Sequence, residues 1–319
     1  MSPFRCEDWR DVPSAVLAPL YAAEIQRWKS QLEWDAGANF EQVELGRRLG
    51  HVRGWLAIDE RDAISGWSFY LQRDGHLQVG GFTASSKACS DAMLKAIFDR
   101  PDASACASTF FAYSDAPGLA PALRARGHAV DRYFYMGRAL VTSAAYPPRD
   151  ARRWNASDRA AAAELMKRAY PLADPARPFA PTGTPDEWLE YVTQATTGTG
   201  CGSLIDDACL SLPLGPERVA AFALVTRISQ STAHLMQLAV DPTMRRRGLG
   251  AALLSAVCTR AFHGGFRRLT MMVSGRNTPA RRLYETAGFE VATSFVGAGK
   301  PQPLRSTSVA GRGVAASFR

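Results

Sequence analysis

The chain has 319 residues, of which 46% are hydrophobic and 21% charged, and its formal net charge is +8. Its length is about twice that of a typical domain, so we expect two domains with ordinary apolar cores. The positive charge comes mostly from scattered arginines, without the basic face and interleaved aromatic residues of a nucleic-acid-binding domain, so we expect no nucleic-acid partner.

The beginning of the chain is polar, and no apolar stretch reaches the length of a membrane span. We therefore expect a cytoplasmic protein without a membrane partner. The six cysteines form no Cys-x-x-Cys pair, and we interpret them as reduced, buried thiols. We expect no metal site.

Apolar periodicity predicts the elements of the first half. In chain order they are a helix over 16–30, strands over 54–60, 64–72 and 76–84, a helix over 86–98, a strand over 108–114, a helix over 118–127 and a strand over 131–140.

Proline, glycine and small residues at 142–152 predict a linker, and the second half repeats the order of the first. Its elements are a short strand, a helix from about Asp158, a helix over 184–196, strands over 208–214, 218–228 and 233–240, a helix from about Met244, a strand over 267–274, a helix over 278–288 and a strand over 289–296.

We interpret both halves as α/β (α+β) domains, each a mixed, mostly antiparallel sheet flanked by helices. The predicted domains are residues 1–145 and 146–319. A flexible basic tail is expected from about residue 297, with a last edge strand near 307–311.

The stretch DPTMRRRGLGAALLSAV (241–257) places Gly248 and Gly250 in the first turn of the predicted helix. Glycine in a helix costs about 1 kcal/mol relative to alanine, so two glycines here need a reason. Uncovered N–H groups at a helix start bind phosphate, helped by the helix dipole, and Arg245, Arg246 and Arg247 add positive charge. The alternative is a turn with solvated arginines.

Two segments resemble the signatures of the GNAT (Gcn5-related N-acetyltransferase) superfamily. The segment 238–254 resembles its acyl-CoA motif, Gln/Arg-x-x-Gly-x-Gly/Ala, through Arg245, Gly248 and Gly250. The segment 273–289 resembles the motif Asn-x-x-Ala-x-x-Leu-Tyr-x-x-x-Gly-Phe through Asn277, Ala280, Leu283, Tyr284, Gly288 and Phe289. The clear resemblance covers residues 230–292.

The resemblance implies that the strand over 233–240 parts from the strand over 267–274. The pantetheine arm of CoA then lies in the gap along Leu238 and Val240, its pyrophosphate rests on the amides of residues 245–250, and Asn277 holds the arm from the other side. The residues expected to bind acyl-CoA are Leu238, Ala239, Val240, Arg245, Arg246, Arg247, Gly248, Leu249, Gly250, Ala251, Asn277, Ala280 and Tyr284.

The resemblance also implies that Tyr284 protonates the departing CoA thiolate. The alternative is a tyrosine packed in the core. His234 stands where several relatives carry a glutamate, six residues before the position of Val240, and we expect it to accept the amine proton. Its alternative is a strand-end histidine with a satisfied hydrogen bond.

The first half lacks these features, because FTASSKACSDAMLKAIF (82–98) has no paired glycines and no arginine. Leu123 takes the place of the tyrosine. We interpret this half as a degenerate copy, a layout that resembles the mycothiol acetyltransferases.

We expect an acyl-CoA-dependent N-acyltransferase with acetyl-CoA as cosubstrate. The primary amine of a small molecule or a peptide would attack the thioester directly in a ternary complex. The alternatives are a non-catalytic acyl-CoA sensor or scaffold, and chemistry on the acyl group itself such as decarboxylation. The amine and the oligomeric state are not identified by the sequence.

Overall fold

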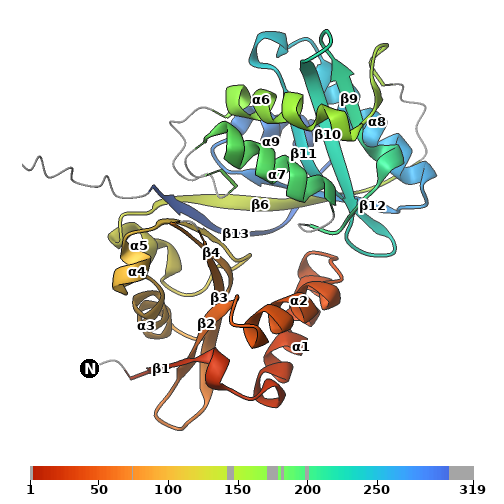
Figure 1. Ribbon diagram of the computed structural model, residues 1–319. Coiled ribbons are helices and arrows are strands. Elements are labelled where there is room, and N and C mark those ends of the chain that lie inside the picture. Colours follow the sequence, from red (N-terminus) through yellow and green to blue (C-terminus); the bar gives the residue numbers. More distant parts are fainter. Residues whose placement is uncertain are drawn as a thin grey trace, which may run out of the picture.

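The computed structural model describes residues 3–73, 75–141, 147–170, 179–180, 183–197 and 201–301. Within these ranges a single sheet of thirteen strands runs through the molecule (Figure 1). Its order is β1-β2-β3-β4-β5-β13-β6-β12-β11-β10-β9-β7, and β8 pairs with β10. None of the helices in the described part is long and apolar enough to cross a membrane.

The first half alternates strands and helices as its periodicity predicts. Its elements are β1 (Arg5–Asp8), α1 (Ser14–Gln31), α2 (Gly37–Arg48), β2 (Arg53–Ile58), β3 (Ile64–Arg73), β4 (His76–Ala84), α3 (Lys87–Phe98), α4 (Pro101–Ser104), β5 (Ala107–Phe111), α5 (Leu119–Ala125) and β6 (Ala129–Ala139). Apolar periodicity did not predict α2, because this helix buries little apolar surface beyond Phe40.

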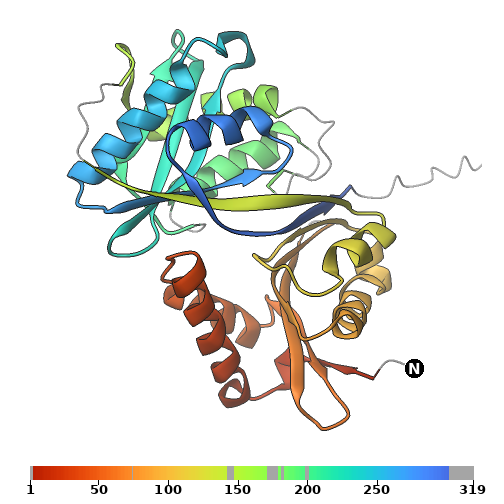
Figure 2. The ribbon, with the colours of Figure 1, turned by 180° about the vertical axis from the view of Figure 1, so that it is seen from behind.

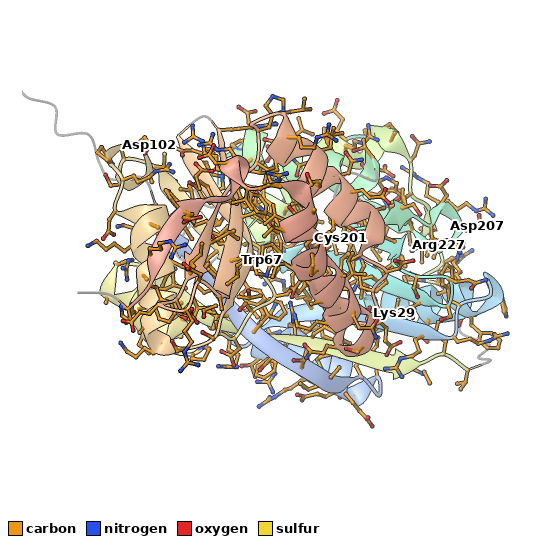
Figure 3. All side chains as sticks on the ribbon, turned by 90° about the horizontal axis from the view of Figure 1, so that it is seen from below. Lys29, Trp67, Asp102, Cys201, Asp207 and Arg227 are labelled. Carbon is orange, nitrogen blue, oxygen red and sulfur yellow. The ribbon has the colours of Figure 1, made fainter. Side chains whose placement is uncertain are left out.

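The helices of the first half cover both faces of its sheet (Figures 1 and 2). The pair α1 and α2 covers one face, and Trp67 of β3 packs against Tyr21 and Phe40 of these helices (Figure 3). The helices α3 and α5 cover the other face over a separate apolar core that includes Met93 and Phe110. Both faces of this part of the sheet are therefore buried.

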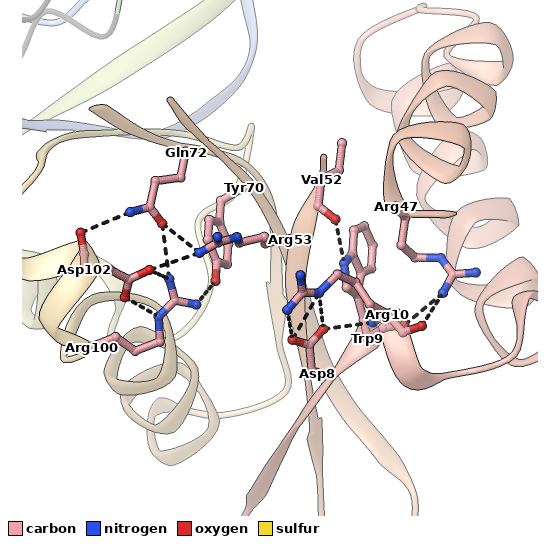
Figure 4. A network of polar contacts seen from close by, with 10 residues as sticks. All are labelled: Asp8, Trp9, Arg10, Arg47, Val52, Arg53, Tyr70, Gln72, Arg100 and Asp102. Atoms are coloured by element: carbon pink, nitrogen blue, oxygen red, sulfur yellow. Dashed lines mark hydrogen bonds and ion pairs between the residues drawn. The ribbon is translucent and has the colours of Figure 1, made fainter. Parts of the chain in front are cut away.

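Polar networks hold helices of the first half against its neighbouring segments (Figure 4). Arg47 of α2 donates to the carbonyls of Trp9 and Val12. Arg100, just before α4, donates to the Tyr70 hydroxyl and to the Gln72 side-chain oxygen of β3. The short helix α4 is thereby held against the sheet.

The second half follows the same plan. Its elements are β7 (Arg152–Arg153), α6 (Arg159–Ala169), α7 (Pro185–Thr197), β8 (Ser203–Leu204), β9 (Leu210–Pro213), β10 (Val219–Arg227), β11 (Thr232–Val240), α8 (Leu249–His263), β12 (Arg268–Ser274), α9 (Thr278–Thr286) and β13 (Glu290–Lys300). The helices α6 and α7 lie on one face of the sheet, and α8 and α9 lie on the other (Figures 1 and 2).

The two halves exchange their last strands. β13, from the end of the second half, lies between β5 and β6 of the first, and β6 in turn pairs with β12 of the second. Only β4–β5 and β11–β12 are parallel pairs among the described strands. The expected mixed, mostly antiparallel sheet is confirmed, although the halves join edge to edge. The boundary near residue 145 stays a prediction, since residues 142–146 lie outside the described ranges.

The structure corrects two boundaries. The predicted start of the tail at about residue 297 is wrong, because residues 297–300 form the end of β13 and pair with β5. The expected strand near 307–311 lies outside the described residues. The helix expected from about Met244 begins at Leu249, because residues 242–244 form a short 3-10 turn and Arg246 has a positive φ of 60°.

The shared strand β13 makes a specific stability prediction at Gly297. A β-carbon at this position would lie 2.5 Å from the ring of buried Tyr133, which packs against Phe111 and Phe295. We expect Gly297→Ala to lower the free energy of unfolding by about 1–3 kcal/mol, the usual cost of overpacking. Val291→Ala, at an exposed position of the same strand, should change it by less than about 0.5 kcal/mol. Urea unfolding measures both; an unchanged midpoint in Gly297→Ala would contradict this packing.

Candidate functional site

The strands β11 and β12 part from each other, as the resemblance implies. They pair in register from Thr232 opposite Arg268 to Leu235 opposite Met271, and the pairing then stops although both strands continue. β11 stays paired with β10 on its other edge as far as Val240. From Met236 onward, β11 therefore presents one unpaired backbone edge to the gap.

The loop after β11 has a defined shape that begins at Asp241. Its buried carboxylate accepts hydrogen bonds from the amide and hydroxyl of Thr243 and from Arg168. Burial alone raises the pKa of this carboxyl, but these hydrogen bonds outweigh burial and lower it to about 2. Asp241 is therefore charged at neutral pH and fixes the first turn of the loop.

The loop ends at an uncapped helix. Gly248 is the N-cap of α8 with a φ of 79°, a left-handed conformation that glycine adopts at little cost, and no side chain caps the helix. The amides of Leu249, Gly250 and Ala251 in the first turn of α8 have no partner within the helix. A β-carbon on Gly248 would meet nothing within 4 Å, so the space beside it is open.

The three arginines of the loop do different things. The Arg245 guanidinium donates to the carbonyls of Val240, at 3.3 Å, and Ala169, at 3.1 Å, and so ties the loop to the end of α6. Arg246 and Arg247 are exposed, and neither forms an ion pair with another described residue. Arg245 therefore shapes the loop, while its two neighbours place mobile positive charge beside the α8 amides.

The helix α9 closes the other side of the gap. The Asn277 side-chain oxygen accepts from the amide of Ala280 and caps this helix. Gly250 lies close to α9, since a β-carbon there would be 3.4 Å from the Leu283 side chain and 3.7 Å from that of Val240. The glycine thus lets the start of α8 approach both α9 and the end of β11.

Tyr284 of α9 is buried, and its ring packs edge-on against Phe289. Burial raises the pKa of its phenol, and the nearby Tyr170 adds to this effect. Its hydroxyl forms no hydrogen bond with another described residue. The structure therefore places the predicted acid on the helix that borders the gap, fully protonated at neutral pH.

A polar cluster on β11 was not predicted from the sequence. The Gln237 side chain accepts from the Tyr191 hydroxyl of α7 and donates to the Tyr170 hydroxyl after α6, both at 3.0 Å. Tyr170 also adds to the raised pKa of Tyr284, so this cluster lies near the predicted acid. No local pattern could reveal it, since its three members come from separate elements.

His234 lies apart from the gap, in the paired segment of β11. Its ring stacks on Tyr135 and contacts Trp34 of the first half, and Nδ1 is 2.9 Å from the Thr270 hydroxyl. Burial lowers its pKa to about 3, so the ring is neutral and binds a proton weakly. Its role as base stays a prediction, and these surroundings weigh against it.

The first half offers an internal comparison. β4 and β5 also part, after Val79 opposite Phe110, and both β4 and β11 carry an irregularity near the parting point. Here, however, only two residues separate β4 from α3, and Ser86 caps α3 through the amide of Cys89. The parting belongs to the fold of both halves, whereas the open loop and uncapped helix belong to the second half.

Comparisons with known proteins agree with this geometry. The model of the acetyltransferase (GNAT) family matches residues 162–289. The [Ribosomal protein bS18]-alanine N-acetyltransferase of Salmonella typhimurium is 40% identical over 77 residues, which cover 24% of this chain and 51% of that protein. The mycothiol acetyltransferase of Kineococcus radiotolerans is 37% identical over 91 residues, 28% of this chain and 29% of that protein. The chain thus spans about half or less of the length of these relatives.

Among solved structures, a GCN5-related N-acetyltransferase from Sphaerobacter thermophilus covers 95% of this chain and 97% of its own, with a TM-score of 0.60 and 19% identity. This likeness shows that the two-part fold as a whole occurs in that protein. The family match over residues 162–289 identifies this part of the second half as an acetyltransferase domain of the GNAT family.

Proposed function

We propose that this chain is an acyl-CoA-dependent N-acyltransferase that transfers acetyl from acetyl-CoA to a primary amine. The observation that carries the proposal is the open, uncapped start of α8 directly beside the unpaired edge of β11. A diphosphate is suited to the α8 amides, and an amide-rich arm is suited to an unpaired strand edge. CoA carries both groups in one molecule, in this order.

The residues of the gap fit the two parts of CoA. The amides from Arg246 to Ala251, with the charges of Arg246 and Arg247, face the diphosphate, and Asp241 and Arg245 hold this loop in shape before binding. The backbone around Leu238 and Ala239 pairs with the pantetheine arm. The side-chain amide of Asn277, whose oxygen is already used as a cap, donates from the α9 side.

Transfer requires that the amine nitrogen attack the thioester carbon and that the carbon–sulfur bond break. The departing thiolate takes its proton from Tyr284 on the bordering helix. The attacking nitrogen loses one proton as the amide forms, and that proton returns through solvent to the Tyr284 phenolate, so the cycle leaves the amide, the free CoA thiol and a protonated tyrosine. The burial that raises the pKa of this phenol raises that of a thiolate in the same gap as well, so the proton can pass as the charge on sulfur develops.

The acceptor amine enters, in this proposal, from the side of Gln237, Tyr170 and Tyr191. These hydroxyl and amide groups lie on the α6–α7 side of β11, across from α8, and they are linked to one another by hydrogen bonds. They offer a polar lining for an amine next to the reacting carbon. The relatives that carry the similar segment are named for acceptors as different as a ribosomal protein and mycothiol.

A matched pair of glycines tests the binding site. Gly248 and Gly265 flank α8, both have a positive φ, and a β-carbon on either meets nothing within 4 Å. We expect Gly248→Asp to weaken acetyl-CoA binding by about 100-fold or more, roughly 2.7 kcal/mol, because a carboxylate then faces the diphosphate. Gly265→Asp carries the same strain and charge and should bind normally. If calorimetry gave Gly248→Asp and Gly265→Asp the same affinity for acetyl-CoA, the loop would not be part of the CoA site.

Tyr284→Phe tests the acid. We expect its turnover number to fall by about 10²–10⁴, the usual contribution of a general acid, while its dissociation constant for acetyl-CoA stays unchanged. Because burial raises the pKa of Tyr284 above the ordinary value of 10, the wild-type rate should show no loss on deprotonation of this acid between pH 7 and pH 10. Steady-state assays with a panel of amines measure both. A fully active Phe variant would contradict the role, and binding without turnover of any amine would favour a sensor.

A further inference from the structure

A cavity of about 220 Å³ lies in the first half, away from the gap between β11 and β12. Its walls are the ends of α3 and α5, the short helix α4, the start of β5 and the last residue of β13. The charged and polar residues that line it are Asp99, Ser104, Ser108, Arg126, His128 and Lys300. None of its lining residues belongs to β11, β12, α8 or α9.

The positive charges in this cavity are only partly balanced. The Lys300 ammonium donates to the carbonyl of Arg126 at 2.9 Å and forms no ion pair with a carboxylate of the described residues. The Arg126 Nε is 3.7 Å from the Asp99 carboxylate, beyond hydrogen-bond distance, and it is buried without a hydrogen-bond partner. The Asp99 carboxylate is therefore the ionic partner of Arg126 alone, and Lys300 has none among the described residues.

His128 adds a third nitrogen group to the wall. It is buried, its Nε2 is 2.9 Å from the Ser108 hydroxyl, and its Nδ1 makes no hydrogen bond with the described residues. Burial, then the charge of Lys300, lower its pKa to about 4, against an opposing effect of the Leu123 backbone. Lys300 and Arg126 therefore both lie close enough to this ring to disfavour its charged form.

We propose that this cavity binds a small oxyanion, either phosphate or the carboxylate of a small metabolite, between Lys300, Arg126 and His128. Buried donors without acceptors are costly, and an oxyanion supplies acceptors and the missing negative charge together. The wall that α4 forms is held in place by Arg100 and its bonds to Tyr70 and Gln72 (Figure 4). An anion here would join the end of β13 to α5 and would stabilise the strand that the second half inserts into the first.

Calorimetric titration of the full chain with inorganic phosphate tests this site, and a parallel titration with acetate or succinate distinguishes the two sources of anion. We expect a saturable phosphate site in the cavity whose affinity falls at least tenfold in Lys300→Ala. It should be retained in Lys95→Ala, a matched control at an exposed position of α3. Any phosphate bound at the start of α8 is common to all these variants, so the difference between them isolates the cavity.

Three further measurements keep the test independent of folding and of acyl transfer. Lys300→Arg keeps the charge and should restore most of the affinity, whereas a merely structural lysine would not respond in this way. In Gly248→Asp the cavity should bind phosphate as the wild type does. NMR should show the pKa of His128 rising when phosphate binds. Equal affinity of wild type and Lys300→Ala, or no saturable binding of either anion, would overturn the proposal.

Discussion

The unpaired edge of β11 is the constraint on which the site depends. Backbone N–H and C=O groups need partners, and β11 loses those on one side where it leaves β12. The same parting occurs between β4 and β5, so it is a property of the fold and does not by itself make a binding site. What distinguishes the second half is the chain that follows the strand.

That chain differs between the halves in length and in its cap. Two serines connect β4 to α3, and the Ser86 hydroxyl caps α3 by accepting from the amide of Cys89. Between β11 and α8 eight residues intervene, shaped by Asp241 at one end and by Gly248 at the other. The longer loop leaves the first amides of α8 without a side-chain cap, and this supports the interpretation of the first half as a copy without the CoA site.

The first half nevertheless contributes to the second. The exchange of β6 and β13 makes the two sheets one, and the turn between α1 and α2 packs onto the paired end of β11. Tyr135 of β6 donates to the carbonyl of Leu32, and the amide of Asp35 donates to the carbonyl of Ile228. The first half therefore supports the strands from which the gap opens. This structural role does not require the first half to have a phosphate-binding loop of its own.

Local sequence patterns predicted most helices and strands, because apolar periodicity reports which face of an element is buried. Helix α2 was not predicted, since it buries little apolar surface. The strand exchange was not predicted either, because pairing between β5 and β13 joins residues far apart in the chain. At the site, the glycine loop and Tyr284 were predicted from their resemblance to the family motifs, and their roles stay predictions. The tie of Arg245 to Ala169, the cluster around Gln237 and the enclosure of His234 depend on tertiary contacts that no motif records.

Amide hydrogen exchange of the full chain, with and without saturating acetyl-CoA, tests the central claim most directly. We predict slower exchange from Met236 to Ala251 on binding, and no change over the corresponding stretch from Gly80 to Lys87 of the first half. Equal protection of both stretches would contradict the claim that only the second half binds CoA. Protection elsewhere, with none between Met236 and Ala251, would contradict the site itself.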